Sequence, residues 1–509
     1  MESYHFPFCQ LSFSFLPNLV FPMRIFFCLL TITLCLTQGI GNVFAQTWGS
    51  ESLPELGDAA SALISPQAEK KIGQKIMNEI RQKEPTYLDD PEVEAYLNRL
   101  GNRLAAASPN PGIGFYFFPL SDPMINAFAT FGGFIGVNSG LILAVRNESE
   151  LAGVLAHEIS HVTQRHLTRG IAREQQLSTA TLLAMAVAIL AAHSRPEVAN
   201  ATIATGTGVA IQAQLGYSRD FEREADRIGL QTLEKAGFDT RNMSSFFSRL
   251  QQTSRVYENN APAYLRTHPL TTERISDMQN REQALPYRQH PDSLEFRLIR
   301  ARLDAMRGTP DEAVTRFARL LETRNILENR YGLAVAQARK KDWGAVENTL
   351  LPALREGKEK SPLIERLYAE ARVKRGDPEG GLAAFRSASA RFPEARAISY
   401  SYAESLLDTR RNEEALRFLE QSVRQYNQDT RLYRLLALAN AQAGRVGAQH
   451  QALAEAYALE GALPAAIEQL ELAQRSPGND FYRASAIDAR LRDLKRRQQE
   501  AARASVSGG

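Results

Sequence analysis

Residues 149–163 read SELAGVLAHEISHVT, and this stretch decides how the first half of the chain folds. The helix that it predicts places His157 and His161 one turn apart, close enough for both imidazoles to bind one zinc ion. Glu158 is turned away from that axis, where it can take a proton from zinc-bound water. The pattern therefore predicts a catalytic metal site. The apolar residues at helical spacing that predict the helix are Leu151, Val154, Leu155 and Val162.

A catalytic zinc ion needs a third protein ligand and one open position. Residues 218–226, SRDFEREAD, predict a second helix on which Glu222 and Asp226 lie one turn apart. We expect Glu222 to be the third ligand and Asp226 to orient a ligand histidine. The alternative is a solvated charged helix, because the neighbouring arginines could pair with these acids.

These motifs resemble a known family. The histidine pair, the block at residues 222–226 and the later His268-Pro269 with Arg274 are similar to the gluzincin peptidases, which include the CAAX prenyl proteases and the HtpX-type heat-shock proteases. The resemblance covers residues 67–290 and continues into the repeats described below. It implies an α+β, mostly helical zinc metalloprotease domain with a small sheet, acting as an endopeptidase.

The resemblance also implies a role for each residue of the motif. His157, His161 and Glu222 bind one Zn²⁺ per chain, which leaves a coordination position for water or substrate. Glu158 is the general base, and it then hands its proton to the leaving amine. These roles are expectations that the tertiary arrangement of the four side chains must support.

Further residues are implied around the metal. Asp226 supports a ligand histidine, while His268 and Arg274 stabilise the tetrahedral oxyanion or position the substrate. His268 could instead bind the metal directly and block the enzyme until it is displaced. Its local sequence is also compatible with a turn residue before proline. We interpret His166, five residues after His161, as a surface histidine or one that supports a ligand, rather than as a fourth ligand.

One helix and a small sheet are predicted before the histidine helix. Between residues 113 and 143, short apolar runs broken by proline and glycine predict strands and turns. Peptidases of this class bind substrate as a strand added to a sheet edge, for which residues 126–129 and 134–137 are candidates, although both could be core strands. A helix begins at Asp90-Pro91, and its apolar residues are Val93, Tyr96, Leu97, Leu100 and Leu104.

An apolar segment follows the histidine helix. Residues 182–192 are apolar, within a stretch that carries no acidic or basic side chain from Gln175 to His193, and a stretch rich in small residues follows at 201–208. A run of this length favours a buried helix of the protease domain. The alternative is a lid, or a hairpin that touches the membrane surface, beside the active site.

Residues 291–493 predict an all-α tetratricopeptide repeat solenoid. Small residues recur there at separations that scatter around the repeat period of about 34 residues. The two helices of a repeat pack closest at this position, so a larger side chain would force them apart. Blocks around residues 448 and 466 extend the array, and residues 494–509 predict a disordered tail. The small positions are Ala313, Ala345, Gly381 and Ala415.

Length and charge restrict the class of protein. A chain of 509 residues can hold two or three domains, so an active site and a recognition module can coexist. The formal net charge is only +3, with acidic and basic residues mixed, which argues against nucleic acid as a partner. All three cysteines lie within residues 1–45, and we expect no disulfide in the mature chain.

The N-terminus predicts an export signal. Arg24 precedes an apolar run and a small-residue site, so cleavage is expected after Ala45, followed by a linker over residues 46–66. The run is shorter than the roughly 20 residues that span a bilayer, which favours a cleaved signal over a membrane anchor. Met23 stands where such signals begin, so residues 1–22 could be a mis-assigned start. The expected location is a bacterial-type periplasm.

Two functions remain open. The preferred one is an endopeptidase that degrades unfolded or misassembled envelope proteins, with repeats that hold the substrate or dock the enzyme to an assembly machine. The resemblance alone implies quality control of outer-membrane proteins. The alternative is a chaperone or scaffold of outer-membrane protein assembly whose protease activity is latent, although the intact Glu158 argues against a dead enzyme. An aminopeptidase would need a site for a free amine, and no motif suggests one.

Overall fold

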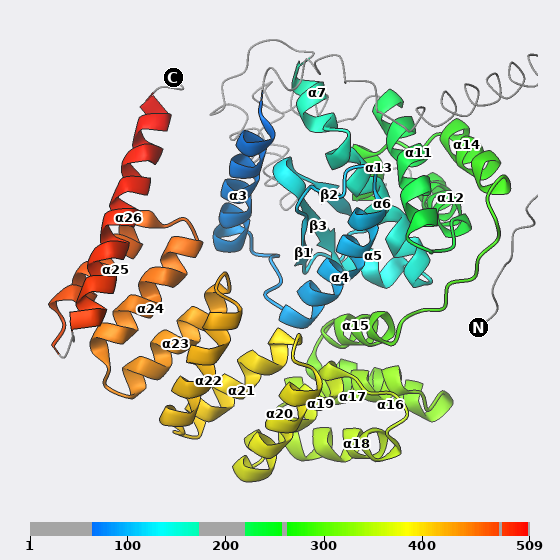
Figure 1. Ribbon diagram of the computed structural model, residues 1–509. Coiled ribbons are helices and arrows are strands. Elements are labelled where there is room, and N and C mark those ends of the chain that lie inside the picture. Colours follow the sequence, from blue (N-terminus) through cyan, green and yellow to red (C-terminus); the bar gives the residue numbers. More distant parts are fainter. Residues whose placement is uncertain (1–63, 173–218, 257–261, 478–480, 507–509) are drawn as a thin grey trace, which may run out of the picture. The chain divides into compact units, whose positions relative to one another are not determined.

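The structure is a computed structural model (Figure 1). The chain divides into two units, Met1–Ala62 and Leu63–Gly509, and everything described belongs to the second. The expected export signal and the apolar segment at 175–208 lie outside the described residues. The structure describes residues 64–172, 219–256, 262–477 and 481–506.

Two capped helices, α3 (Pro66–Lys83) and α4 (Pro91–Ala107), open the protease half. The Asp90 carboxylate accepts hydrogen bonds from the backbone N–H groups of Glu92 and Val93, which the helix itself leaves unpaired. Proline suits the first turn because no N–H is needed there. The helix predicted at Asp90-Pro91 is confirmed, and its apolar residues are buried: Val93, Tyr96, Leu97, Leu100 and Leu104.

A three-stranded sheet follows, built from β1 (Tyr116–Leu120), β2 (Ala127–Ala129) and β3 (Phe134–Asn138) in the order β1-β3-β2. β1 runs parallel to β3 and β2 antiparallel to it. The turn between β2 and β3 contains Gly132, whose φ of 69° suits glycine. The predicted mixture of strands and turns is confirmed.

The sheet order corrects one of the two candidate substrate edges. β3 pairs with a strand on each side, so residues 134–137 form the centre of the sheet and cannot accept an added strand. β2 pairs only with β3 among the described strands, which leaves residues 127–129 at an edge. Hydrophobicity alone did not separate the two, because both strands are apolar.

The histidine helix α6 (Glu148–Thr163) lies at the centre of the protease half (Figure 1). It packs against α4, α11, α12 and β2, and for this reason every residue of α6 except Val162 is buried. The apolar stripe predicted from the sequence is therefore only one side of a helix that is covered all round. The helices near it are α5 (Ser139–Ala144), α7 (His166–Ala172), α11 (Arg219–Lys235), α12 (Arg241–Val256), α13 (Ala263–Thr267) and α14 (Thr272–Gln283).

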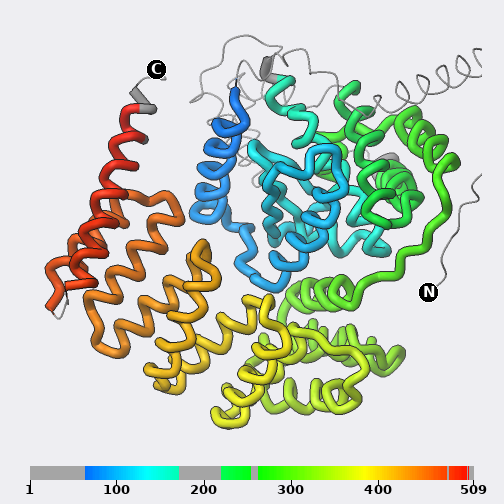
Figure 2. The backbone as a smooth tube through the Cα atoms, in the orientation of Figure 1, coloured from blue at the N-terminus to red at the C-terminus, as the bar shows by residue number. Residues whose placement is uncertain are grey.

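Consecutive helices form the second half, and Figure 2 follows them from green to red. Neighbours in this series pack against each other, as the repeat prediction requires. The helices are α15 (Leu294–Ala305), α16 (Pro310–Thr323), α17 (Leu327–Arg339), α18 (Trp343–Glu356), α19 (Pro362–Lys374), α20 (Pro378–Arg391), α21 (Arg396–Asp408), α22 (Asn412–Gln425), α23 (Thr430–Gln442), α24 (Val446–Leu459), α25 (Leu463–Arg475) and α26 (Phe481–Val506).

The repeat register agrees with the prediction except at one position. The fourth residues of α16, α20 and α22 are Ala313, Gly381 and Ala415, and all three are buried. In α18 the equivalent residue is Val346, while the predicted Ala345 is only half-buried. The prediction is one residue off there, because a small residue was sought and the repeat has a valine. A Cβ on Gly381 would lie 2.8 Å from the Val373 backbone nitrogen.

The C-terminal helix also differs from the prediction. α26 continues to Val506, although the polar sequence from residue 494 predicts a disordered tail. Ile487, Leu491 and Leu494 are buried against the preceding helices. Residues 495–500 are exposed and continue the same helix. Nowhere in the described ranges is there a helix with the length and apolarity to cross a bilayer.

Buried ion pairs join α15 and α19 to the start of α4. Arg302 Nε lies 2.7 Å from an Asp90 carboxylate oxygen, and Arg366 Nε lies 2.6 Å from Glu92 Oε1. The Glu92 and Asp90 side chains are 4% and 3% exposed, so in each pair the arginine compensates a buried carboxylate. The solenoid is thus attached to the protease half through specific side chains.

Candidate metal centre

α6 and α11 bring the predicted ligands together. His157 and His161 lie on α6, Glu222 lies on the first turns of α11, and all three are buried. The two helices pack closely at Gly229, where an added Cβ would lie 3.2 Å from the His157 backbone nitrogen. The close approach allows a carboxylate from one helix to reach the imidazoles of the other.

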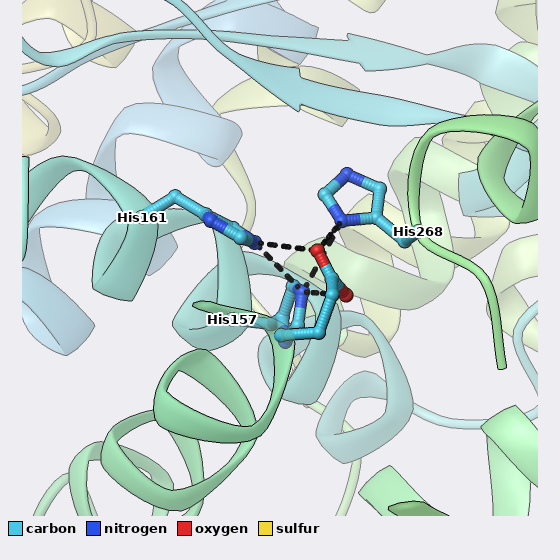
Figure 3. Close-up of side chains that lie close together, drawn as sticks. His157, His161 and His268 are labelled. Atoms are coloured by element: carbon cyan, nitrogen blue, oxygen red, sulfur yellow. Dashed lines mark hydrogen bonds and ion pairs between the residues drawn. The ribbon is translucent and has the colours of Figure 1, made fainter. Parts of the chain in front are cut away.

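The donor atoms converge (Figure 3). His157 Nε2 lies 3.0 Å from His161 Nε2 and 3.5 Å from Glu222 Oε2, and His161 Nε2 lies 3.5 Å from Glu222 Oε1. Zinc–ligand bonds of about 2.0–2.1 Å in a tetrahedron place neighbouring ligand atoms roughly 3.3 Å apart. The residues present therefore fit one small divalent cation.

His268 is the fourth member of this cluster. It follows α13, and its Nδ1 lies 3.0 Å from Glu222 Oε1 and 3.4 Å from His157 Nε2. One donor atom from each of the four residues lies within 4.8 Å of the others. The Tyr264 ring stacks on the imidazole with a centroid distance of 4.6 Å. This geometry is that of a potential metal ligand rather than of a turn residue.

Asp226 and Arg274 support the ligands from behind. An Asp226 oxygen lies 3.0 Å from His157 Nδ1, and Arg274 pairs with both Asp226 oxygens at 2.7 and 2.8 Å. Arg274 Nη1 also lies 2.7 Å from Glu222 Oε2. In this arrangement the guanidinium holds two carboxylates of the cluster, which differs from the predicted contact with substrate or oxyanion.

Glu158 lies between the cluster and the edge strand. Its Oε2 accepts a hydrogen bond of 3.1 Å from Ala129 N–H on β2. Its Oε1 is buried without a hydrogen-bond partner and lies 3.5 Å from His268 Nε2. Burial raises the pKa of this carboxyl. A carboxylate with one fixed and one uncommitted oxygen is suited to accept and return a proton.

Burial and neighbouring charges shift the pKa values of the cluster side chains. Desolvation opposes charge on His157, but the adjacent carboxylates of Asp226 and Glu222 outweigh it and raise the pKa to about 9. Burial and the charge of His157 together lower the pKa of His161 well below its usual range. Burial also opposes charge on Glu222, but the charges of His268 and His157 dominate and lower that pKa. A cation bound here would take over the role of these protons.

Sequence reasoning did not single out several contributors. Ala129 N–H fixes the Glu158 carboxylate, Tyr264 stacks on His268, and Glu224 bonds to His166 Nε2 at 3.0 Å. Glu224 lies in the charged block next to the predicted third ligand, yet its partner cannot be read from the sequence. His166 is fully buried, which excludes the surface option that the sequence left open.

The fold and the site together define a metallopeptidase that carries a helical repeat domain. The model of peptidase family M48 matches residues 91–282, and the model of the tetratricopeptide repeat matches residues 372–439. Both matches fall where the structure has the histidine cluster and the helix series.

Three relatives are 30–40% identical to this chain over the matched residues. The beta-barrel assembly-enhancing protease of Yersinia pestis is 31% identical over 462 residues, which cover 89% of this chain and 94% of the relative. The protein of the same name from Escherichia coli K12 is 30% identical over 480 residues, with 92% and 97% covered. A relative from Vibrio cholerae is 40% identical over 301 residues, 59% of this chain and 60% of its own. The chain belongs to the family of beta-barrel assembly-enhancing proteases.

Proposed function

We propose that the chain is a zinc-dependent endopeptidase of the periplasm that degrades misfolded or misassembled outer-membrane proteins. One observation carries the proposal: two imidazoles and a carboxylate lie 3.0–3.5 Å apart, beside a glutamate with an uncommitted oxygen. The names of the relatives support a role in outer-membrane protein assembly. Zinc is the preferred metal because imidazole and carboxylate ligands in a tetrahedral arrangement suit it.

In this proposal His157, His161 and Glu222 hold the metal. When bound, zinc would supply Lewis acidity toward a water molecule and the scissile carbonyl. Asp226 keeps the His157 proton on Nδ1, which leaves the Nε2 lone pair for coordination. The Arg274 guanidinium pairs with both Glu222 and Asp226, so it keeps the two like-charged carboxylates together in the buried site.

Glu158 performs the proton transfers. Its Oε1 takes a proton from the attacking water and delivers it to the leaving amine, while the Ala129 N–H keeps the other oxygen in place. The same bond ties the base to β2, the edge at which a peptide can add as a strand. A substrate strand on β2 would therefore lie beside the base and the metal ligands.

His268 is proposed as a resting-state ligand. Its Nδ1 belongs to the donor cluster, so it would occupy the coordination position that a peptidase needs for water or substrate. Displacement of the imidazole would open this position, and the ring could then donate to the oxyanion. His268→Ala should raise basal cleavage of an unfolded protein. A loss of cleavage at unchanged zinc content would favour the oxyanion role instead.

The repeats are proposed to bind substrate or the outer-membrane protein assembly machinery. Repeat arrays present extended surfaces for peptides and partner helices, and the array here is fixed to α4 by ion pairs. Contact of residues 175–193 with the membrane surface stays part of the proposal. An attached array also favours the second candidate, a chaperone or scaffold of assembly whose protease is latent.

Zinc content and cleavage of casein test the proposal together. The wild type should contain one zinc ion per chain and cleave casein, and His157→Ala should lose both. Glu158→Gln should keep the metal and lose cleavage. Absence of zinc in the wild type, or cleavage that survives His157→Ala, would refute the enzyme assignment. If Glu158→Gln supports every cellular task of the wild type, the scaffold function is the correct one.

A further inference from the structure

His166 contacts the ligand histidine His161 on the side opposite the metal cluster. His161 Nε2 faces the cluster, 3.0 Å from His157 Nε2, whereas His161 Nδ1 lies 2.8 Å from His166 Nδ1. The His166 side chain is fully buried. The proposed function gives His166 no task, although this side chain touches a metal ligand directly.

The short distance between the two Nδ1 atoms fixes where the protons are. Two ring nitrogens at hydrogen-bond distance need one N–H and one lone pair. If His161 offers its Nε2 lone pair to a metal, its proton lies on Nδ1, and His161 is the donor. His166 must then accept at Nδ1, which places its own proton on Nε2.

A carboxylate stands where this second proton requires an acceptor. His166 Nε2 lies 3.0 Å from Glu224 Oε2, and Arg169 Nη1 lies 2.9 Å from the same oxygen. The Phe221 ring stacks on the His166 ring at a centroid distance of 4.5 Å and an angle of 11°. Glu224 therefore sets the His166 tautomer, and stacking sets the orientation of the ring.

The backbone between the two histidines is bent to make this contact. α6 ends at Thr163 and α7 begins at His166, and Arg165 between them has a φ of 52°, in the left-handed region. Such a conformation is unfavourable for a residue with a side chain. Arg165 is held there by Glu69, whose Oε1 lies 2.9 Å from Arg165 Nη2. The turn brings His166 back beneath His161.

We propose that His166 is a positioning residue for the metal site: with Glu224 it holds His161 in the tautomer that presents Nε2 to the ion. The inference rests on the proposed function, because it requires His161 to be a ligand. The two ligand histidines are then supported differently. His157 has a carboxylate beside its Nδ1, whereas His161 reaches its carboxylate through a second imidazole.

A pair of substitutions at residue 166 tests this. His166→Phe keeps an aromatic ring to stack on Phe221 but has no acceptor, and it should lower zinc affinity by about tenfold or more. His166→Asn places an acceptor oxygen near the position of Nδ1, and it should restore most of that loss. Zinc affinity is measured on the full chain by competition with a chelator, and the visible spectrum of the Co²⁺-loaded protein reports the ligand geometry. Zinc affinity of the Phe variant within threefold of the wild type would overturn the proposal.

Two further variants distinguish a positioning role of His166 from a merely structural one. Glu224→Ala should lower zinc affinity in the wild type and cause no further loss in the His166→Phe background, whereas a structural role predicts independent losses. If His166→Phe does not fold, Glu224→Ala decides, and unchanged zinc affinity of that variant refutes the inference.

His157→Ala is measured in parallel to test the metal site itself: if this variant retains zinc, the proposed metal site fails. If His157→Ala loses zinc but His166→Phe does not, only the role of His166 fails.

Discussion

Asp226→Asn tests how the support around the ligands contributes to metal binding. The substitution keeps the shape of the side chain, but it puts an NH₂ group where one carboxylate oxygen accepts from Arg274 at 2.7–2.8 Å. Two donors then face each other, so the arginine moves and its 2.7 Å contact with Glu222 loosens. Loss of such outer contacts lowers metal affinity by about 10–100-fold, or roughly 1.4–2.7 kcal/mol. We expect the upper half of this range, because His157 and Glu222 are both affected.

Zinc affinity is measured by chelator competition at pH 7, and peptide cleavage is measured at saturating zinc. Asp220→Asn is the matched control, since Asp220 lies on the same helix with a 73% exposed side chain and pairs only at the surface with Arg223. The control should bind zinc like the wild type. The reasoning is refuted if Asp226→Asn binds zinc within threefold of the wild type, or if the control loses as much.

Three further predictions concern stability, measured by urea unfolding. Burial raises the pKa of Glu282 from 4.5 to about 7, so the contribution of this carboxyl to stability is complete below pH 4.5 and lost as pH rises through 7. Glu282→Gln should flatten this decline in the free energy of unfolding. A pH profile of stability that Glu282→Gln leaves unchanged would contradict this prediction. Arg366→Met leaves Glu92 buried with less compensation and should cost roughly 3 kcal/mol; a cost below 1 kcal/mol would count against the ion pair. Gly381→Val should lower the free energy of unfolding by about 1–3 kcal/mol through overpacking. Gly344→Ala, whose Cβ would meet nothing within 4 Å, should not destabilise the fold. Equal losses of stability in the two variants would disprove the packing argument.

The metal centre holds several charged side chains in a buried, tightly packed environment. A carboxylate and several imidazoles in a dry environment are unfavourable unless a cation or a proton compensates them. The close approach of α11 to α6 at Gly229 brings them together, and Arg274 supplies one positive charge from behind. Metal binding should consequently stabilise the fold as well as enable chemistry.

Helical periodicity explains what could be predicted about the site. His157 and His161 are four residues apart, as are Glu222 and Asp226, so each pair lies on one side of its helix whatever the rest of the chain does. A local rule of the same kind predicts the helix cap at Asp90, directly before Pro91. These features depend on residues within one or two turns of each other.

Contacts between distant segments could not be predicted in this way. The orientation of Arg274 toward two carboxylates depends on how α14 packs on α11, and the link from His166 to Glu224 spans two helices. The choice of β2 rather than β3 as the sheet edge likewise depends on strand order. Local composition does not predict any of these three features, because each depends on which distant segments pack together.

The sequence by itself determined that the chain has two ligand-bearing helices, a short sheet and a helical repeat array, because spacing along a helix or strand is a local property of the backbone. Only the tertiary structure decided that His268 joins the donor cluster and that His166 contacts His161 from behind. These outcomes depend on which surfaces pack together, and packing follows from shape and burial across the whole molecule rather than from neighbouring residues.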